Sequence, residues 1–308
     1  MAFANGVVMR SGKSWAWARD DGTVLHGTAA SVLEGRRWLR LPVLRAAVAF
    51  IEMTAFSLRL HRLNGGRRTS RLLFCLAICI LASVALSSAV HALIENRMLG
   101  GVVLQALGIL LALAVLQLGM GTEVWRYHGA EHKVVNAYEA GADLHEVAVS
   151  MRFSRIHDRC GTNLVVIVFA LALLCLPMGT GALGQGLSLI AAVLMVAVAL
   201  ELFRLIERAP RSPFSRAVLF AGRTLQRVLM TREPRSEHLE LASKALLGVI
   251  EAEYVSLYQG KAQLRPGNQP ARCSPSYWSR TALSRCQAAG LNDVRALSGR
   301  AVRSTSPI

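Results

Sequence analysis

Two histidines and a glutamate at helical spacing carry the strongest chemical signal in the chain. His128 and His132 are four residues apart, so on a helix both imidazoles lie on one face and can bind a single metal ion. Glu131 lies three residues from His128, at the edge of that face. Its carboxylate can reach a water molecule beside the ion without binding the ion itself. This HxxEH order matches the inverted zincin arrangement and predicts a metal-dependent hydrolase with Glu131 as the general base.

Two histidines leave a catalytic zinc site incomplete, because such sites usually have three protein ligands. The leading candidates for the other ligands are His157 and Cys160, near the end of the same loop. Glu139 shares the helix face of His132 but lies about 10 Å further along the axis, which suits a second ion or a ligand-orienting role. The expected cofactor is a divalent metal ion, with zinc favoured. The alternative for each residue is an ordinary structural role in the core or among headgroups.

The elements that must position these residues are mainly helices. The motif predicts a helix over 123–141 with Gly141 just after its end. Asp143 and Glu146 then match an N-cap and capping box that would open a second helix. Residues 213–230 predict a basic amphipathic helix, and residues 237–258 predict another. Near the N-terminus, residues 14–19 and 23–26 alternate on either side of a turn at 20–22, which predicts a small β-hairpin over 5–28.

Long apolar blocks separate these elements. Of the 308 residues, 53% are hydrophobic, and the mean hydropathy of +0.39 exceeds what a soluble core requires. Blocks at 72–90, 102–120, 164–178 and 183–202 predict transmembrane helices. Residues 41–63 are also apolar but carry Arg45, Glu52 and Arg59, which favours a helix in the membrane interface over a span. The predicted fold class is mainly α: a polytopic integral membrane protein with about four transmembrane helices, a small N-terminal β-hairpin and cytoplasmic amphipathic helices.

The distribution of Lys and Arg predicts the orientation. Twelve precede the first block, one lies in the link 91–101, five lie in the loop 121–163, none lies in the turn 179–182, and 17 lie from residue 204 onward. Because basic loops remain in the cytoplasm, both termini and the motif loop are predicted to be cytoplasmic in a multi-pass protein of the bacterial cytoplasmic membrane. The net charge of +16 is better explained by topology and anionic lipid than by nucleic acid. Membrane lipids are therefore the expected partners, no nucleic acid is expected, and a homo-oligomer is left open.

These patterns divide the chain into four parts. Residues 1–71 hold the cytoplasmic hairpin and the interfacial helix. Residues 72–203 form a four-helix membrane domain that includes the motif loop 121–163. Residues 204–258 form a cytoplasmic helical region. Residues 259–308, rich in Ser, Pro, Arg, Gln and Gly, predict a disordered basic tail.

Several of these segments resemble the YqhQ-like family, also known as the domain of unknown function 1385 family. The central match is residues 127–133, followed by 137–141 and 159–162; residues 6–10 match the family's opening motif, and 231–234 with 237–240 match its closing one. The family is described as predicted metal-dependent membrane enzymes, so the resemblance implies a membrane protein with a metal site. Asp158 stands where the family usually has proline, and Asn5 stands at a usually acidic position. Compared with the family's usual opening, the N-terminus is expected to be truncated or misassigned.

The favoured function is a metal-dependent hydrolase at the cytoplasmic membrane surface, where a lipid or envelope substrate would suit the location. The alternative is a non-enzymatic membrane scaffold or assembly factor with a structural metal site. A closed four-ligand site that included both His157 and Cys160 would favour the scaffold, because no position would remain for water. A transporter is disfavoured, because transport paths normally need buried ionisable groups. Between their ends, the predicted spans carry only Gln105, Gln117 and, near a boundary, Glu201.

Overall fold

A small antiparallel sheet forms the N-terminal part of the molecule. The computed structural model describes residues 1–29, 41–63, 82, 86, 96–175 and 185–262. Strands β1 (Ala2–Phe3), β2 (Gly6–Ser11), β3 (Ser14–Arg19) and β4 (Val24–Thr28) lie in sequence order, each antiparallel to the next. Gly12 takes a positive φ of 49° in the tight turn between β2 and β3. The predicted hairpin over 5–28 is therefore confirmed, as part of a four-stranded sheet.

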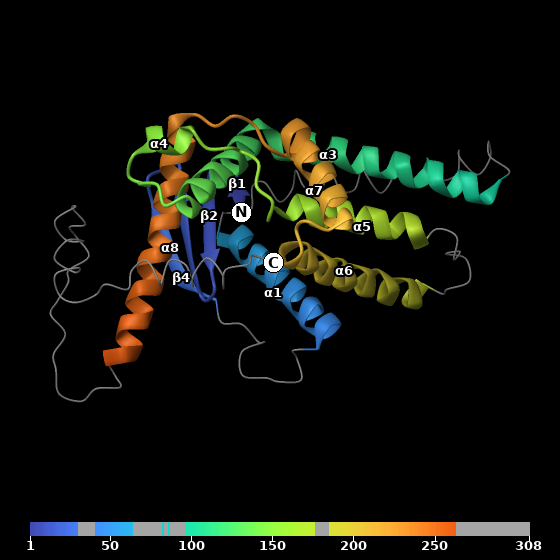
Figure 1. Cartoon of the computed structure of the whole chain (residues 1–308), viewed down its shortest axis with the longest axis horizontal. Coiled ribbons are helices and arrows are strands. Elements are labelled where there is room, and N and C mark those ends of the chain that lie inside the picture. The colour runs from blue at the N-terminus through green and yellow to red at the C-terminus, as the bar shows by residue number, and fades with distance from the viewer. Residues whose placement is uncertain (30–40, 64–81, 83–85, 87–95, 176–184, 263–308) are drawn as a thin grey trace.

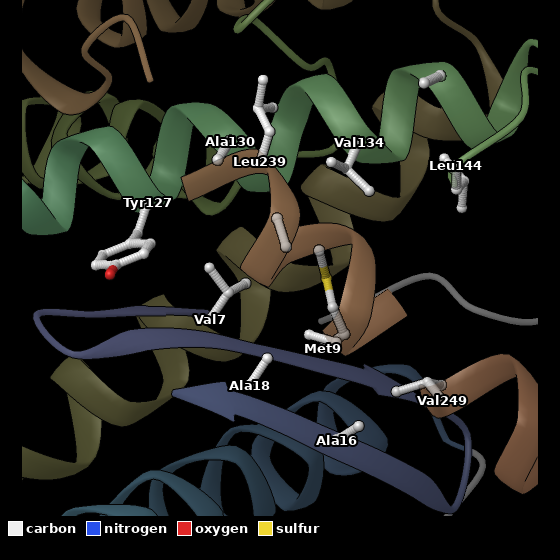
Figure 2. Close-up of a cluster of buried hydrophobic side chains, with 13 residues drawn as sticks. Val7, Met9, Ala16, Ala18, Tyr127, Ala130, Val134, Leu144, Leu239 and Val249 are labelled. Atoms are coloured by element: carbon white, nitrogen blue, oxygen red, sulfur yellow. The ribbon is translucent and has the colours of Figure 1, made fainter. Parts of the chain in front are cut away.

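Helices cover both faces of this sheet. On one face, Val7, Met9, Ala16 and Ala18 pack against α8 (Ser236–Ala262) and the C-terminal half of α3 (Arg97–Glu139), as Figure 2 shows. On the other face, Val8, Trp15 and Trp17 pack against Phe56 and Leu60 of α1 (Pro42–Leu63). Because both faces are covered, successive residues of β3 are buried rather than alternating between buried and exposed. The sheet thus fixes α3 and α8 relative to each other.

The motif helix is the C-terminal half of a longer, bent helix. α3 bends by 58° between its segments Leu99–Val115 and Gln117–Glu139, and Gly121 has φ 77° and ψ 166° inside it. A positive φ of this size suits glycine, which has no Cβ. The predicted helix over 123–141 is confirmed, with Gly141 at φ 72° just beyond its last turn.

The predicted capping box at Asp143 and Glu146 was wrong. Asp143 Oδ1 accepts a hydrogen bond from the His145 backbone N–H at 2.9 Å and so closes a local turn. The short helix α4 (Val147–Met151) begins only after Glu146, whose side chain makes no capping hydrogen bond. The same short polar side chain that caps a helix can stabilise a turn instead, and here the turn forms.

The remaining helices extend from this unit. Helix α5 (Gly161–Cys175) packs against α6 (Gln185–Arg208), and α7 (Pro213–Leu225) lies across α5 and continues as the π-helix η4 (Gln226–Met230). The N-terminal half of α3, α5 and α6 all extend away from the sheet (Figure 1). Helix α1 packs on α6, where Arg45 forms an ion pair with Glu201 at 2.5 Å. The predictions of helices over 213–230 and 237–258 are confirmed.

The described helices test the four predicted spans only in part. The first span, 72–90, lies outside the described residues apart from positions 82 and 86, and so do the turn before α6 and the tail after residue 262. Among the described helices, none alone has both the length and the apolar character needed to cross a bilayer. The two segments of α3 meet that criterion as a bent pair, and Gly161–Leu174 is a shorter apolar helix.

Candidate metal centre

Three of the predicted ligands converge in the structure. The His128 and His132 rings have centroids 4.4 Å apart on one face of α3. Cys160 lies immediately before α5, and its Sγ is 3.4 Å from His128 Nε2. One potential ligand atom from each of the three residues lies within 4.8 Å of the other two. Two imidazoles and a thiolate at this separation form the kind of donor set that binds zinc or a similar soft divalent ion.

Backbone carbonyls fix both imidazole rings. His128 Nδ1 lies 2.7 Å from the carbonyl oxygen of Met230, and His132 Nδ1 lies 2.8 Å from that of Arg155. A carbonyl only accepts, so each Nδ1 must carry the hydrogen and donate it. In the neutral form of each imidazole, Nε2 then carries the lone pair that can bind a metal ion. Metal-binding histidines are typically oriented by such a hydrogen bond from the other ring nitrogen, and this geometry supplies it for both residues.

The acceptor of His128 exists because a helix ends there. The last carbonyls of a helix have no partner inside it, and η4 ends at Met230. The Met230 carbonyl accepts from His128, and the Leu229 carbonyl accepts from Gln117 Nε2 at 2.5 Å. The Arg227 carbonyl accepts from Arg155 at 3.2 Å. The π-helix thus presents its terminal carbonyls to α3 and to the motif loop, in keeping with the frequent occurrence of π-helices at functional sites.

One close backbone approach and several hydrogen bonds hold this end of η4 against the site. A Cβ atom on Gly129 would lie 2.3 Å from the Arg232 carbonyl oxygen, so only glycine fits at this position of α3. The Arg232 backbone N–H donates to the Trp125 carbonyl at 2.9 Å. Arg155 donates to the hydroxyl of Thr231 at 2.9 Å as well as to its carbonyl. The segment after η4 is therefore held directly on the helix face that carries the histidines.

Charge coupling favours the thiolate form of Cys160. Burial alone would raise the pKa of this thiol, but hydrogen bonds and charge interactions with His128 and His132 hold the pKa well below its usual range. Burial would likewise lower the pKa of His128, and its pairing with Cys160 raises that pKa instead. The Thr162 hydroxyl lies 3.2 Å from Sγ and can donate to it. The thiolate is the form of cysteine that binds metal ions, so this environment suits Cys160 as a candidate ligand.

Glu131 lies beside the three ligands. Its Oε1 accepts from the amino group of Met1 at 2.8 Å, while its buried Oε2 has no hydrogen-bond partner among the described residues. Burial would raise the pKa of this carboxyl, but the charges of the Met1 amino group, His128 and His132 lower it below its ordinary value. These charges favour the ionised form of Glu131, in which both carboxylate oxygens are hydrogen-bond acceptors.

The structure does not bring His157 into the group of three. Its Nε2 lies 3.5 Å from Glu139 Oε1, and Glu139 also pairs with Arg159 at 2.8 Å. Gln226, fully buried, accepts from the His157 backbone N–H at 3.0 Å and donates to its carbonyl at 3.1 Å. These contacts turn the imidazole toward Glu139. The His157 ring still lies close to the site, with its centroid 5.8 Å from that of His132.

The sequence did not predict the residues that surround the candidate ligands and hold the motif loop in place. The Met230 and Arg155 carbonyls orient the two histidines, and Gln226 holds the motif loop at His157. Glu233 pairs at 2.6 Å with the buried Lys133. Glu233 lies in the segment 231–234, which resembles the family's closing motif, but the sequence gives no sign that this segment meets the histidines. The carbonyl acceptors leave no side-chain signal, so no residue-type pattern could have identified them.

Comparison with known proteins confirms the family resemblance. A family model described as a protein of unknown function, DUF1385, matches residues 41–252. Over 140 residues the chain is 31% identical to the uncharacterized protein YqhQ of Bacillus subtilis (strain 168); the alignment covers 43% of this chain and 42% of that protein. No solved structure matches the chain.

Proposed function

We propose that this chain, which belongs to the DUF1385 family of proteins of unknown function, is a metal-dependent hydrolase whose ion is held by His128, His132 and Cys160. The single observation that carries the proposal is the convergence of these three side chains with both Nδ1 atoms engaged by backbone carbonyls. The thiolate and two imidazoles favour zinc among divalent ions. Three protein ligands also suit a catalytic site, which keeps a position open, better than a closed structural one.

In this proposal the chain's own residues divide the work. Met230 and Arg155 hold the imidazoles through their carbonyls, and Thr162 supports the thiolate. Glu131 removes a proton from the attacking water through Oε2, the acceptor atom that has no partner in the described part of the chain. The bound ion would supply a Lewis acid that activates water near neutral pH.

We further propose that the site lies at the cytoplasmic surface of a membrane. The four apolar blocks and the basic-residue pattern of the sequence support this location. Helices α3, α5 and α6 also expose large apolar side chains, including Leu110 (62% exposed), Leu118 (80%) and Leu174 (72%). A cluster of this kind faces lipid or a partner more readily than water. Both termini and the motif loop would then be cytoplasmic.

The first experiment measures metal content per chain by elemental analysis of protein purified in detergent without chelators. We expect about one zinc per chain in the wild type. We expect its loss in the His128→Ala/His132→Ala double variant and in Cys160→Ala. The absence of metal above background in the wild type would refute the proposed centre.

The second experiment separates an enzyme from a scaffold. We expect Glu131→Gln to retain the metal while hydrolysis of a panel of chromogenic carboxylate and phosphate esters falls by about 100-fold or more, the usual effect of removing a general base. Glu240→Gln, on the exposed surface of α8, is the matched control because, among the described residues, the one ion pair of Glu240 is with Lys244. If Glu131→Gln retains metal and full activity, the general-base role is wrong. The three ligands would then serve the scaffold alternative, as a structural clamp between α3 and α5.

A further inference from the structure

A polar pocket opens beside the proposed metal centre. Its cavity is about 470 Å³, within the range that holds a small ligand. The motif loop lines it with His157 and Arg159, and α7 and η4 line it with Arg223 and Arg227. Asn136 of α3 completes the wall.

The pocket and the metal centre lie along the same face of α3. Asn136 follows His132 by four residues, which is slightly more than one helical turn and about 6 Å along the axis. His157 lines the pocket, and its ring centroid is 5.8 Å from that of His132. A ligand seated here would therefore extend toward the metal ligands.

Positive charge exceeds negative charge in this pocket. Its wall carries three guanidinium groups and two carboxylates. Arg159 pairs with Glu139 at 2.8 Å, and Arg223 pairs with Asp158 through two hydrogen bonds of 2.7 and 2.6 Å. The Arg227 guanidinium has no ion-pair partner among the residues that the structure describes. The two ion pairs hold their arginines in fixed positions, and Arg227 is the unneutralised charge.

We infer that this pocket binds a phosphate group. Guanidinium groups bind phosphate with geometry that suits several parallel hydrogen bonds, and a surplus of arginine over carboxylate at a pocket wall attracts a dianion. Arg223 commits Nε and Nη2 to Asp158, so its Nη1 can donate to a ligand. That the phosphate belongs to the substrate rests on the proposed function, since it follows from the neighbouring metal centre.

The phosphate could come from a soluble ester or from a lipid headgroup. Phe220, 74% exposed on α7, precedes Arg223 by less than one turn, and Val228, 69% exposed, follows Arg227 directly. Exposed apolar side chains on the two helices that carry the arginines could contact an acyl chain, but they would add nothing for a free phosphate. The two sources are therefore distinguishable by affinity.

Titration calorimetry of the full chain tests the inference. The protein is purified in a maltoside detergent, which has no phosphate, treated with chelator, and titrated with inorganic phosphate at constant ionic strength. We expect saturable one-to-one binding that weakens by about tenfold or more in Arg227→Gln, because a charge-assisted hydrogen bond is lost. The matched control is Arg216→Gln, an exposed arginine of α7 outside the pocket, which we expect to bind within about twofold of the wild type.

Three results would overturn the pocket assignment. The first is that phosphate does not bind saturably to the wild type. The second is that phosphate binds equally well to the wild type and to Arg227→Gln. The third is that Arg227→Gln and Arg216→Gln weaken phosphate binding equally. The last would mean that overall surface charge, rather than the pocket, attracts phosphate.

The metal and phosphate sites can fail separately. The His128→Ala/His132→Ala variant should lose metal and keep phosphate binding. Metal without phosphate binding would overturn this inference alone, and phosphate binding without metal would overturn the proposed function alone. Short-chain phosphatidic acid, used below its micelle concentration, should bind more tightly than glycerol 3-phosphate if the source is a lipid. Equal affinities would assign the pocket to a soluble phosphate ester.

Discussion

Replacing Gly129 by alanine sets two opposing effects against each other. In a helix interior, alanine is more favourable than glycine by about 1 kcal/mol, so helix propensity alone predicts a more stable protein. The structure predicts the opposite. The new Cβ would lie 2.3 Å from the Arg232 carbonyl oxygen, and ordinary contact begins at 3.4 Å, so the segment after η4 must move by about 1 Å.

The net effect follows from what this displacement disturbs. Overpacking of this kind costs about 1–3 kcal/mol. Moving Arg232 also strains its hydrogen bond to the Trp125 carbonyl and the bond that the Met230 carbonyl accepts from His128, each of which contributes about 1 kcal/mol. When the gain in helix propensity is subtracted from these costs, we expect Gly129→Ala to lower the free energy of unfolding by about 1–3 kcal/mol. Zinc affinity should fall about 10–100-fold, as when an outer-shell partner of a ligand is lost.

The assay pairs denaturant unfolding, followed by tryptophan fluorescence, with zinc competition against a chromogenic chelator. Gly108→Ala is the matched control, because Gly108 lies in the same helix and its added Cβ would meet nothing within 4 Å. A Gly129→Ala protein as stable as Gly108→Ala, with wild-type zinc affinity, would refute the close contact between α3 and the segment after η4.

Two further predictions concern the ligands and the topology. Zinc affinity should fall as the pH decreases. The pKa of His128 is raised, so at a pH below that pKa the zinc ion must displace a proton from the imidazole. Each further decrease of one pH unit then lowers the zinc affinity by about tenfold. A chelator competition series from about pH 5.5 to 8 measures this slope, and a flat profile would contradict the imidazole–thiolate pairing with Cys160. If the chain crosses the membrane as proposed, alkaline phosphatase fused within residues 91–101 should lie outside the cytoplasm and be active, whereas a fusion within residues 121–163 should be cytoplasmic and inactive. The reverse result would exclude the proposed orientation.

The part of the site encoded by local spacing could be predicted from the sequence. His128 and His132 share a face because four residues make about one turn of an α-helix, whatever the rest of the chain does. The β-hairpin followed in the same way from alternation and turn residues. Cys160 was also a candidate, because its chemistry suits a ligand and it lies in the same loop, and its Sγ lies 3.4 Å from His128 Nε2.

The orientation of the loop could not be predicted, because distant residues decide it. His157 and Cys160 are three residues apart and are both good ligand types, yet only Cys160 joins the histidine pair. Gln226, 69 positions further along the chain, holds the His157 backbone and leaves its ring facing Glu139. No pattern within 157–163 contains that information. The hydrogen bonds of His128 Nδ1 and His132 Nδ1 could not be predicted either, because their acceptors are backbone carbonyls.

The hydrogen bond from His128 to the Met230 carbonyl joins residues 102 positions apart, and this has a consequence for biosynthesis. A ribosome adding about 5–20 residues per second needs about 5–20 s to make the intervening chain. During that interval the His128 imidazole has no acceptor to fix its tautomer, although both histidines have already emerged. We therefore expect stable metal loading to follow completion of η4 rather than emergence of the motif. A nascent chain truncated before residue 226 should release its zinc to a chelator much faster than the finished protein.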